Sequence, residues 1–334
     1  MSEDRVFGSV PRDAPSSTAL HGDKGSRPLI GVDLGGTKIL AGLAVPGGKL
    51  LAVHEEPTRH GEGAPVLAQI AELALRLTED SGFELADVAQ MVIGVPSAVS
   101  PQTGLASLSP NLSLPADQPL STLVGRLLAC PVAVENDVNL AAYGEAIADD
   151  ADDPGSLVLV SFGTGVGMGL VINGEIVRGA FGRAGEIAYL PIGGRPHGLA
   201  PSSENGLFED MVGTRAIRKR FDLGAGSVVD LFDRAKAGDG PSLAAIDEVA
   251  REASIGIAAV QALIDPSRIV IGGGIGSQPL FLERLTHHLA PLLPFACRVE
   301  PSRFGARAGL VGALAFAARL AGVRPATAGV QNAS

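Results

Sequence analysis

The chain has 334 residues and a net charge of −10, with 46% hydrophobic and 19% charged residues. This length predicts two domains or lobes, and this composition can bury a sizeable core. The acidic balance argues against a general nucleic-acid binder, which normally presents a basic face. Two cysteines, Cys130 and Cys297, exclude a disulfide scaffold and a cysteine-rich zinc site. With no apolar run of about 18 residues and no secretion signal, we expect a cytoplasmic protein without a membrane span.

The two ends of the chain differ in composition from its middle. Residues 1–27 are rich in Ser, Pro, Gly and Asp, and residues 324–334 are similar, so both are predicted to be disordered or flexible tails. Between them, short apolar runs alternate with helical periods, which is typical of an α/β protein. The first helix is predicted after Pro65, because apolar residues then recur at helical spacing: Val66, Ile70, Leu73 and Leu77.

Two segments, residues 29–54 and 157–178, repeat one plan. Each reads as a strand, a polar turn with Gly and Thr, a second strand, a tight turn and a third strand. In the later segment the tight turn is Asn173-Gly174, a strong hairpin signal. The repetition predicts a duplicated architecture with two lobes and a cleft between them. Further buried strands are predicted at residues 91–95, 132–135 and 269–271.

Three glycine-rich turns follow predicted strands and are candidates for holding phosphate. In Asp33-Leu34-Gly35-Gly36-Thr37-Lys38, glycine lets backbone N–H groups point at an anion, and Thr37 and Lys38 add a hydroxyl and a cation. The aspartate of this turn could hold a hydrated magnesium ion, or it could be structural. The second turn, Gly163-Thr164-Gly165, could clamp a polyphosphate from the other side, and the third, Gly272-Gly273-Gly274, could lie under a nucleotide. Each turn by itself also fits an ordinary hairpin or loop.

Glu135-Asn136-Asp137 closes a predicted strand and opens a predicted helix. Functional groups commonly follow the carboxyl ends of strands in open α/β sheets. Asp137 could therefore act as a general base for a substrate hydroxyl, while Asn136 holds a neighbouring hydroxyl. The alternative is that Asp137 only caps the helix.

Together and in this order, the motifs resemble the ROK family of repressors, open reading frames and sugar kinases. The resemblance implies an α/β, actin-like ATPase fold with two lobes, duplicated as in ribonuclease-H-like proteins. It implies an N-terminal lobe at 28–138, completed by a helix near 311–322, and a larger lobe at 139–310. It also implies a glucokinase- or fructokinase-like enzyme that uses ATP and Mg²⁺. The stretches that carry it are residues 30–43, 134–145, 157–185, 269–276 and 304–312.

The resemblance also implies roles for individual residues. Asp137 matches the catalytic base of the family. Carboxylates and amides match its sugar ligands, since these groups hold hydroxyls by directional hydrogen bonds. Without the resemblance, the two glutamates among them would be interpreted as solvated or capping carboxylates. The matching ligand positions are Asn136, Glu186, Glu209 and, in the loop on the far side of the sugar pocket, Ser97 and Asn111.

Three features depart from patterns known in the family. Tyr189 stands where the kinases commonly carry a histidine, so the identity of the sugar is open. Residues 193–206 lack the family's zinc-binding cysteines, and His197 alone cannot complete a tetrahedral site, so we predict no structural zinc. The stretch before Ile30 is too short and polar for the DNA-binding module of the repressors, so we expect no DNA binding through it.

The sequence therefore predicts transfer of the ATP γ-phosphoryl group to a hydroxyl of a hexose or hexose derivative, most of all at C6, with Asp137 as the base. Two alternatives stay open: a sugar-binding pseudokinase that senses a ligand and acts through a partner, and a kinase whose donor is polyphosphate. The resemblance also suggests a homodimer or a larger homo-oligomer. The pairs His54/His60 and His287/His288 are interpreted as ordinary surface or helix histidines.

Overall fold

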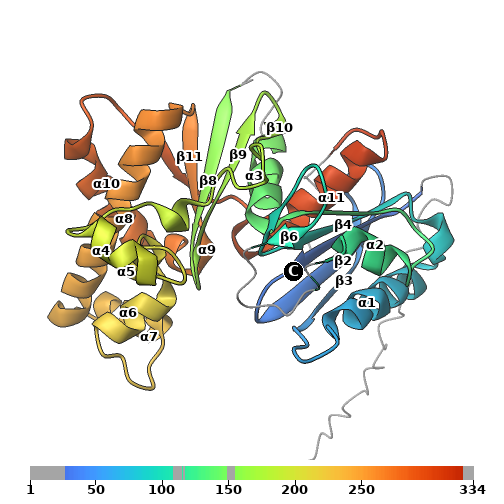
Figure 1. The fold of residues 1–334 in the computed structure, drawn as a ribbon, viewed down its shortest axis with the longest axis horizontal. Coiled ribbons are helices and arrows are strands. Elements are labelled where there is room, and N and C mark those ends of the chain that lie inside the picture. Colours follow the sequence, from blue (N-terminus) through green and yellow to red (C-terminus); the bar gives the residue numbers. More distant parts are fainter. Residues whose placement is uncertain (1–26, 108–114, 116, 149–154, 326–334) are drawn as a thin grey trace, which may run out of the picture.

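The structure is a computed structural model that describes residues 27–107, 115, 117–148 and 155–325. Almost all of the two predicted tails, and Asn111 of the predicted sugar loop, lie outside these residues. The described chain forms two α/β lobes, each built on a five-stranded sheet (Figure 1). The two-lobed α/β fold expected from the sequence is therefore confirmed.

The first sheet contains β1 (Leu29–Leu34), β2 (Lys38–Ala44), β3 (Leu50–Pro57), β4 (Gln90–Val95) and β7 (Val132–Asn136). Its strand order is β3-β2-β1-β4-β7. The first three strands along the chain form an antiparallel meander, and β4 and β7 then add in parallel to β1. The polar residues that end β1 and β7 therefore lie at the same edge of the sheet.

The second sheet contains β8 (Ser156–Phe162), β9 (Val166–Ile172), β10 (Glu175–Ile176), β11 (Arg268–Gly272) and β12 (Val299–Pro301). Its order is β10-β9-β8-β11-β12, again an antiparallel meander followed by two parallel strands. Corresponding strands occupy the same places in both sheets, which confirms the duplicated plan. A short antiparallel pair, β5 (Ala98–Val99) and β6 (Ala106–Ser107), follows β4.

Two helices, α3 (Asp137–Ile147) and α11 (Ala308–Leu320), pack against each other between the two sheets (Figure 1). α11 contacts β1 and β4 of the first sheet, and α3 contacts β8 and β9 of the second. Apolar residues of both helices and of both sheets form one buried cluster there. The chain therefore crosses between the lobes through a shared hydrophobic layer.

The outer faces of the sheets are covered by the remaining helices. α1 (Val66–Ser81) and α2 (Leu120–Gly125) pack on the first sheet, and the predicted apolar stripe of α1 is buried there. α8 (Gly240–Ile264) and α10 (Pro279–Leu289) pack on the second sheet. Shorter α-helical segments are α4 (Pro196–Leu199), α5 (Glu209–Val212), α6 (Thr214–Arg220), α7 (Val228–Lys236) and α9 (Gly273–Gly276). Single 3₁₀ turns are formed by Leu85–Asp87, Ile187–Tyr189, Ala200–Ser202, Ala290–Leu292 and Gly305–Arg307.

Glycines let α3 and α11 approach each other closely. A Cβ added to Gly312 of α11 would overlap the carbonyl oxygen of Leu140 in α3. A Cβ added to Gly144 of α3 would lie 2.9 Å from the backbone nitrogen of Gly312. The backbones of the two helices are therefore in direct contact. Any residue with a Cβ at these positions would not fit at this separation.

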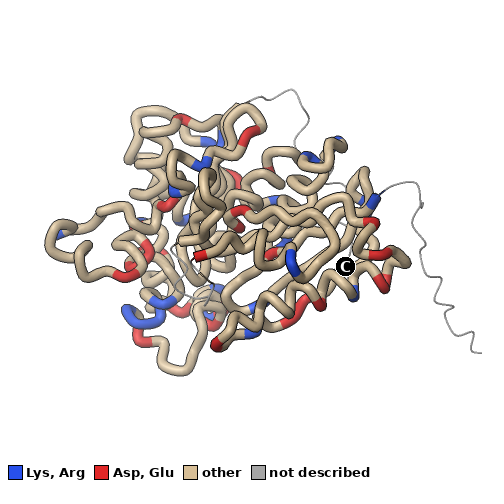
Figure 2. Tube along the Cα trace, turned by 45° about the vertical axis from the view of Figure 1, so that its right-hand side comes forward, with Lys and Arg blue, Asp and Glu red and all other residues tan. Residues whose placement is uncertain are grey.

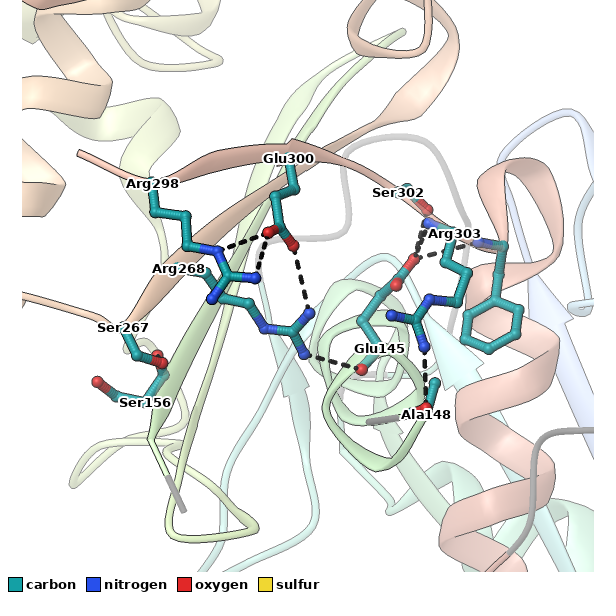
Figure 3. Close-up of polar contacts among 10 residues, drawn as sticks. Glu145, Ala148, Ser156, Ser267, Arg268, Arg298, Glu300, Ser302 and Arg303 are labelled. Atoms are coloured by element: carbon teal, nitrogen blue, oxygen red, sulfur yellow. Dashed lines mark hydrogen bonds and ion pairs between the residues drawn. The ribbon is translucent and has the colours of Figure 1, made fainter. Parts of the chain in front are cut away.

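A buried carboxylate fastens α3 to the chain that leads into α11 (Figure 3). Glu145 is 2% exposed, and its Oε1 accepts hydrogen bonds from the Ser302 hydroxyl at 2.6 Å and from the Arg303 backbone N–H at 2.9 Å. The Phe304 N–H donates to the same oxygen at 3.2 Å. Arg268 of β11 donates to the Glu145 carbonyl oxygen at 3.3 Å. This cluster holds the crossing between the lobes in place.

Figure 2 shows acidic and basic residues scattered along the trace, mostly separated by uncharged stretches. Among the helices of the described residues, none is both long enough and apolar enough to span a membrane.

Candidate active site

A cavity of about 540 Å³ lies between the lobes. Its walls come from the turns after β1 and β8, the end of β7 with the start of α3, and the segments around residues 182–189 and 204–209. Most of the predicted site residues meet there, although they are far apart in the sequence. The predicted residues that line the cavity are Gly35, Gly36, Thr37, Ser97, Asn136, Asp137, Gly163, Thr164, Gly165, Glu186, Tyr189 and Glu209.

The turns after β1 and β8, here called the first and second glycine turns, are fastened in the same way. In the first, Thr58 donates its backbone N–H to the Thr37 carbonyl at 3.0 Å and its hydroxyl to the Gly35 carbonyl at 2.7 Å. In the second, Thr214 donates its N–H and its hydroxyl to the Gly163 carbonyl, at 3.0 and 2.8 Å. Each lobe thus presents one turn, held from behind by a threonine, to the cavity.

The third glycine turn lies beside the second one and does not line the cavity. Gly273 has a φ of +81°, and a Cβ there would overlap the Phe162 carbonyl oxygen. A Cβ added to Gly163 would lie 3.5 Å from the backbone nitrogen of Gly274. The predicted nucleotide contact of Gly273 and Gly274 is therefore adjacent to the second turn, at the start of α9.

Lys38 is not brought to the cavity, contrary to the sequence-based expectation. It is the first residue of β2, and its Nζ lies 2.7 Å from Oε2 of Glu55 on the neighbouring strand β3. Both side chains are about half exposed. The physical reason is that the chain already runs as a strand at Lys38, so its side chain joins a cross-strand ion pair on the sheet surface.

Asp33 lies behind the first glycine turn and does not line the cavity. Its carboxyl packs against the first turn of α11, where a Cβ on Gly309 would overlap it. Burial, followed by the negative charge of Asp137, raises the pKa of Asp33 to about 7, against a smaller lowering by Lys38. Asp33 is therefore a half-buried carboxyl whose negative charge is not fully compensated by the protein.

Asn136, and not Asp137, caps α3. The Asn136 side-chain oxygen accepts the Asn139 N–H at 2.9 Å, and its amide donates to the Ser97 carbonyl at 3.3 Å. Asp137 is the first helical residue, and one of its oxygens accepts the Val138 N–H at 2.8 Å. Burial raises the pKa of Asp137 to about 6, which suits a general base working near neutral pH.

The residue before Asn136 supports this strand end. Glu135 is buried, and its Oε2 lies 2.5 Å from Nε of Arg178 in the other lobe. Its other oxygen accepts hydrogen bonds from the Asn136 N–H at 2.9 Å and the Asn139 amide at 3.0 Å. An ion pair between the lobes therefore orients the segment that carries Asp137.

Glu186, Tyr189 and Glu209 form the wall on the side of the second lobe. Burial and then the charge of Asp137 raise the pKa of Glu186, and burial also raises the pKa of Glu209. Glu209 Oε2 accepts the Val166 N–H at 2.9 Å, which anchors it to β9. Burial and then the charges of Glu186 and Glu209 raise the pKa of Tyr189, whose side chain lines the cavity and is partly exposed.

The cavity residues that were not predicted as site residues include His60, Glu204 and Asn205. His60 stands two residues beyond Thr58, which holds the first glycine turn. Its type and neighbours carry no signal that separates it from a surface histidine. Glu204 and Asn205 lie in the segment where only the absence of cysteines had been noted.

Within the described residues, no group of three or more His, Cys, Asp or Glu side chains is arranged to hold a metal ion. Magnesium requires fewer protein ligands, because it usually keeps several waters and takes one or two carboxylates. Asp33 and Asp137 fit this requirement, since both are half-buried carboxyls and the charge of Asp137 raises the pKa of Asp33. A divalent cation would neutralise the charge that they concentrate.

The duplicated lobes and the glycine turns facing a common cavity define an actin-like ATPase fold. The sequence model of the ROK family matches residues 29–319, and the chain belongs to this family. It is 28% identical over 288 residues to a beta-glucoside kinase of Listeria monocytogenes, covering 84% of this chain and 94% of that one. It is 30% identical over 312 residues to a glucokinase of Streptomyces coelicolor, covering 85% and 95%.

A solved structure agrees with these sequence relationships. The ROK family glucokinase of Streptomyces griseus, determined in complex with glucose and AMPPNP, superposes with a TM-score of 0.75 and 28% identity. The match covers 87% of this chain and 99% of that one. The expected actin-like ATPase fold and membership of the ROK family are thus confirmed.

Proposed function

We propose that this sugar kinase transfers the γ-phosphoryl group of ATP to a hexose, with the C6 hydroxyl as the acceptor and Asp137 as the general base. The observation that carries the proposal is the position of Asp137. Asp137 lines the same cavity as the two glycine turns, and burial raises its pKa to about 6. Relatives named as glucokinase and beta-glucoside kinase support a hexose or hexoside as the acceptor.

In the reaction, Asp137 takes the proton of the sugar hydroxyl as the hydroxyl oxygen bonds to the γ-phosphorus. The bond from the γ-phosphorus to the bridging oxygen breaks, and its electron pair leaves on ADP. The products are a sugar phosphate, ADP and the proton held by Asp137. Catalysis of this kind rests on positioning and on electrostatic stabilisation of the transferring group.

The two glycine turns supply the positioning. Gly35 and Gly36 on one lobe and Gly163 and Gly165 on the other let the backbone approach the phosphates closely. Thr37 and Thr164 offer hydroxyls in the same walls. When bound, Mg²⁺ neutralises charge on the phosphates, and Asp33 with Asp137 would hold it through waters.

The acceptor is held by groups that point into the cavity from both lobes. Glu186 and Glu209 accept hydrogen bonds from sugar hydroxyls. The side-chain oxygen of Asn136 can accept one more hydrogen bond besides the one that caps the helix. The Tyr189 phenol donates or accepts one bond where a histidine would otherwise stand. Ser97 lies at the far side, and Asn111 stays a proposed contact. We also propose a homo-oligomer, as the resemblance suggests.

The proposal is tested by ADP release with ATP and magnesium over a panel of glucose, mannose, fructose, N-acetylglucosamine, N-acetylmannosamine and allose, beside a control without sugar. Turnover with one sugar well above the control, and phosphate found at C6 of the product, is the expected result. Turnover with polyphosphate but not with ATP would show that polyphosphate is the phosphoryl donor. If the protein binds ATP but releases no ADP above the control with any sugar, a sugar-sensing pseudokinase is favoured.

A further inference from the structure

The loop formed by residues 203–206 closes one side of the cavity. Glu204 and Asn205 line the cavity together with Tyr189 and Glu209. Glu204 is exposed and Asn205 is half-buried, so both can reach a ligand. The mechanism described above uses neither residue.

A hydrogen-bonded clasp, Ser203 with Asp210, fixes this loop. The Ser203 hydroxyl donates to Oδ2 of Asp210 at 2.6 Å and accepts the Gly206 N–H at 2.9 Å. The Asp210 N–H donates to the Gly206 carbonyl at 3.0 Å. Both ends of the loop are thereby joined to the first turn of α5, whose first residue is Glu209.

The same loop is packed tightly against the backbone of the Tyr189 segment. Gly206 has a φ of +94°, and a Cβ there would overlap the Ala188 carbonyl oxygen and lie 2.8 Å from the Tyr189 nitrogen. The Phe208 N–H donates to the Ala188 carbonyl at 3.0 Å. The positions of Glu204, Asn205, Tyr189 and Glu209 are therefore coupled through one clasped loop.

The charge of this wall restricts what it can bind. The cavity is lined by the carboxyls of Asp137, Glu186, Glu204 and Glu209, and none of the described residues that line it is Lys or Arg. Carboxylates accept hydrogen bonds and repel anions, and burying an unpaired anion beside them is costly. A ligand part that fits here presents hydroxyl or ammonium donors and carries no negative charge.

We propose that Glu204 and Asn205 are specificity-determining residues for the acceptor sugar and that the Ser203–Asp210 clasp is what positions them. The inference rests on the proposed sugar kinase function. The clasped loop selects hexoses that offer hydrogen-bond donors at the Tyr189 side of the cavity and rejects sugars that carry an anionic substituent there. Ser203 and Asp210 are positioning residues and do not touch the sugar.

The first test compares two neighbouring serines. In Ser203→Ala the clasp is lost, whereas in Ser202→Ala only an exposed hydrogen bond to the Leu199 carbonyl, 3.0 Å long, is removed. Ser203→Ala should raise the KM for the preferred hexose about 10-fold, while the KM for ATP and kcat change by less than about twofold. Ser202→Ala should behave as the unchanged protein. Asp210→Asn, which keeps an acceptor oxygen for Ser203, should give an intermediate effect.

The second test isolates the charge of Glu204 and leaves the clasp intact. Methyl glucoside and glucose 1-phosphate are compared as competitive inhibitors against the preferred hexose, since they differ in charge at the same carbon. The unchanged protein should bind the phosphate more weakly, and Glu204→Gln should narrow the ratio of the two inhibition constants about 10-fold. Asn205→Ala should raise the KM for the hexose without narrowing that ratio.

Two outcomes would overturn the inference. One is a Ser203→Ala protein that matches Ser202→Ala with every sugar, or whose KM for ATP rises as much as its KM for the sugar. The other is an inhibition ratio that Glu204→Gln leaves unchanged. If the unchanged protein phosphorylates no sugar at all, the proposed function itself fails, and this assignment fails with it.

Discussion

The carboxyl of Asp33 at the end of β1 senses the charge of Asp137 at the start of α3, which after burial is the largest cause of the raised pKa of Asp33. Asp33 lies near the end of β1 and Asp137 directly follows β7, and only β4 separates these two parallel strands in the first sheet. Two carboxyls whose charges interact in this way resist ionising together. The arrangement concentrates negative charge next to the cavity, where the proposed function requires a cation and a phosphoryl group to meet.

Activity should depend on pH through the protonation of Asp137. Burial raises its pKa to about 6, and a general base works only when it is deprotonated. Turnover at saturating ATP and magnesium should therefore rise as the pH increases through about 6 and level off above it. The measurement is kcat/KM for the sugar between pH 5 and 8. A flat profile over this range would contradict the assignment.

Asp33→Asn should stabilise the protein at high pH and not at low pH. Because the folded pKa is raised from 3.8 to about 7, the folded state holds this proton more tightly than the unfolded state. In the unchanged protein, the stability that protonated Asp33 contributes relative to its ionised form is fully present below the unfolded pKa. It is lost as the pH rises through about 7, and Asn, which does not ionise, avoids this loss. Urea unfolding without magnesium should show a gain of up to roughly 4 kcal/mol at pH 8. A gain of the same size at pH 4 would refute this explanation.

Glu145→Ala should strongly destabilise the protein. Glu145 is buried, and the donors of Ser302, Arg303 and Phe304 would lose their shared acceptor. Leaving buried donors without a partner should lower the free energy of unfolding by about 3 kcal/mol. Glu145→Gln is the matched control, because its amide oxygen can still accept these bonds. Denaturant unfolding curves that do not separate the two variants would argue against this role of the cluster.

Metal removal should abolish activity without unfolding the protein. A chelator is expected to stop turnover, added magnesium should restore it, and the Tm should change little, because we predict no structural zinc. Metal analysis of the purified protein should find far less than one zinc per chain. Zinc that survives the chelator at one per chain, or a large fall in Tm on chelation, would show that a structural metal had been missed.

The fold and most of the cavity could be predicted because their signals are local and repeated. The duplicated pattern of strand, glycine turn and strand is visible at Gly35-Gly36-Thr37 and at Gly163-Thr164-Gly165, and the structure places both turns at one cavity. Asp137 follows a strand end, where ligands of α/β sheets commonly bind. Family resemblance then pointed to Glu186 and Glu209, which the types of these residues alone did not mark out.

The remaining contacts depend on long-range packing that the sequence does not display. Lys38 was predicted to contact phosphate, but its ammonium group forms an ion pair with Glu55 on the neighbouring strand. Capping of the helix was the alternative interpretation of Asp137, whereas Asn136 provides the cap one residue earlier. His60 and Glu204 line the cavity from two loops whose hydrogen bonds, from Thr58 to Gly35 and from Ser203 to Asp210, join residues far enough apart that the local sequence does not reveal them.

The most direct test of the central claim is the turnover of Asp137→Asn. Asparagine keeps the size of the side chain and can still accept the Val138 N–H, so the fold and sugar affinity should be preserved. With no base to take the hydroxyl proton, kcat with the preferred sugar should fall by about 100- to 10,000-fold. The Kd for the sugar, measured by calorimetry, should stay within about threefold of that of the unchanged protein, which is a change in binding free energy of less than about 1 kcal/mol. A variant that keeps most of its turnover would show that Asp137 is not the base.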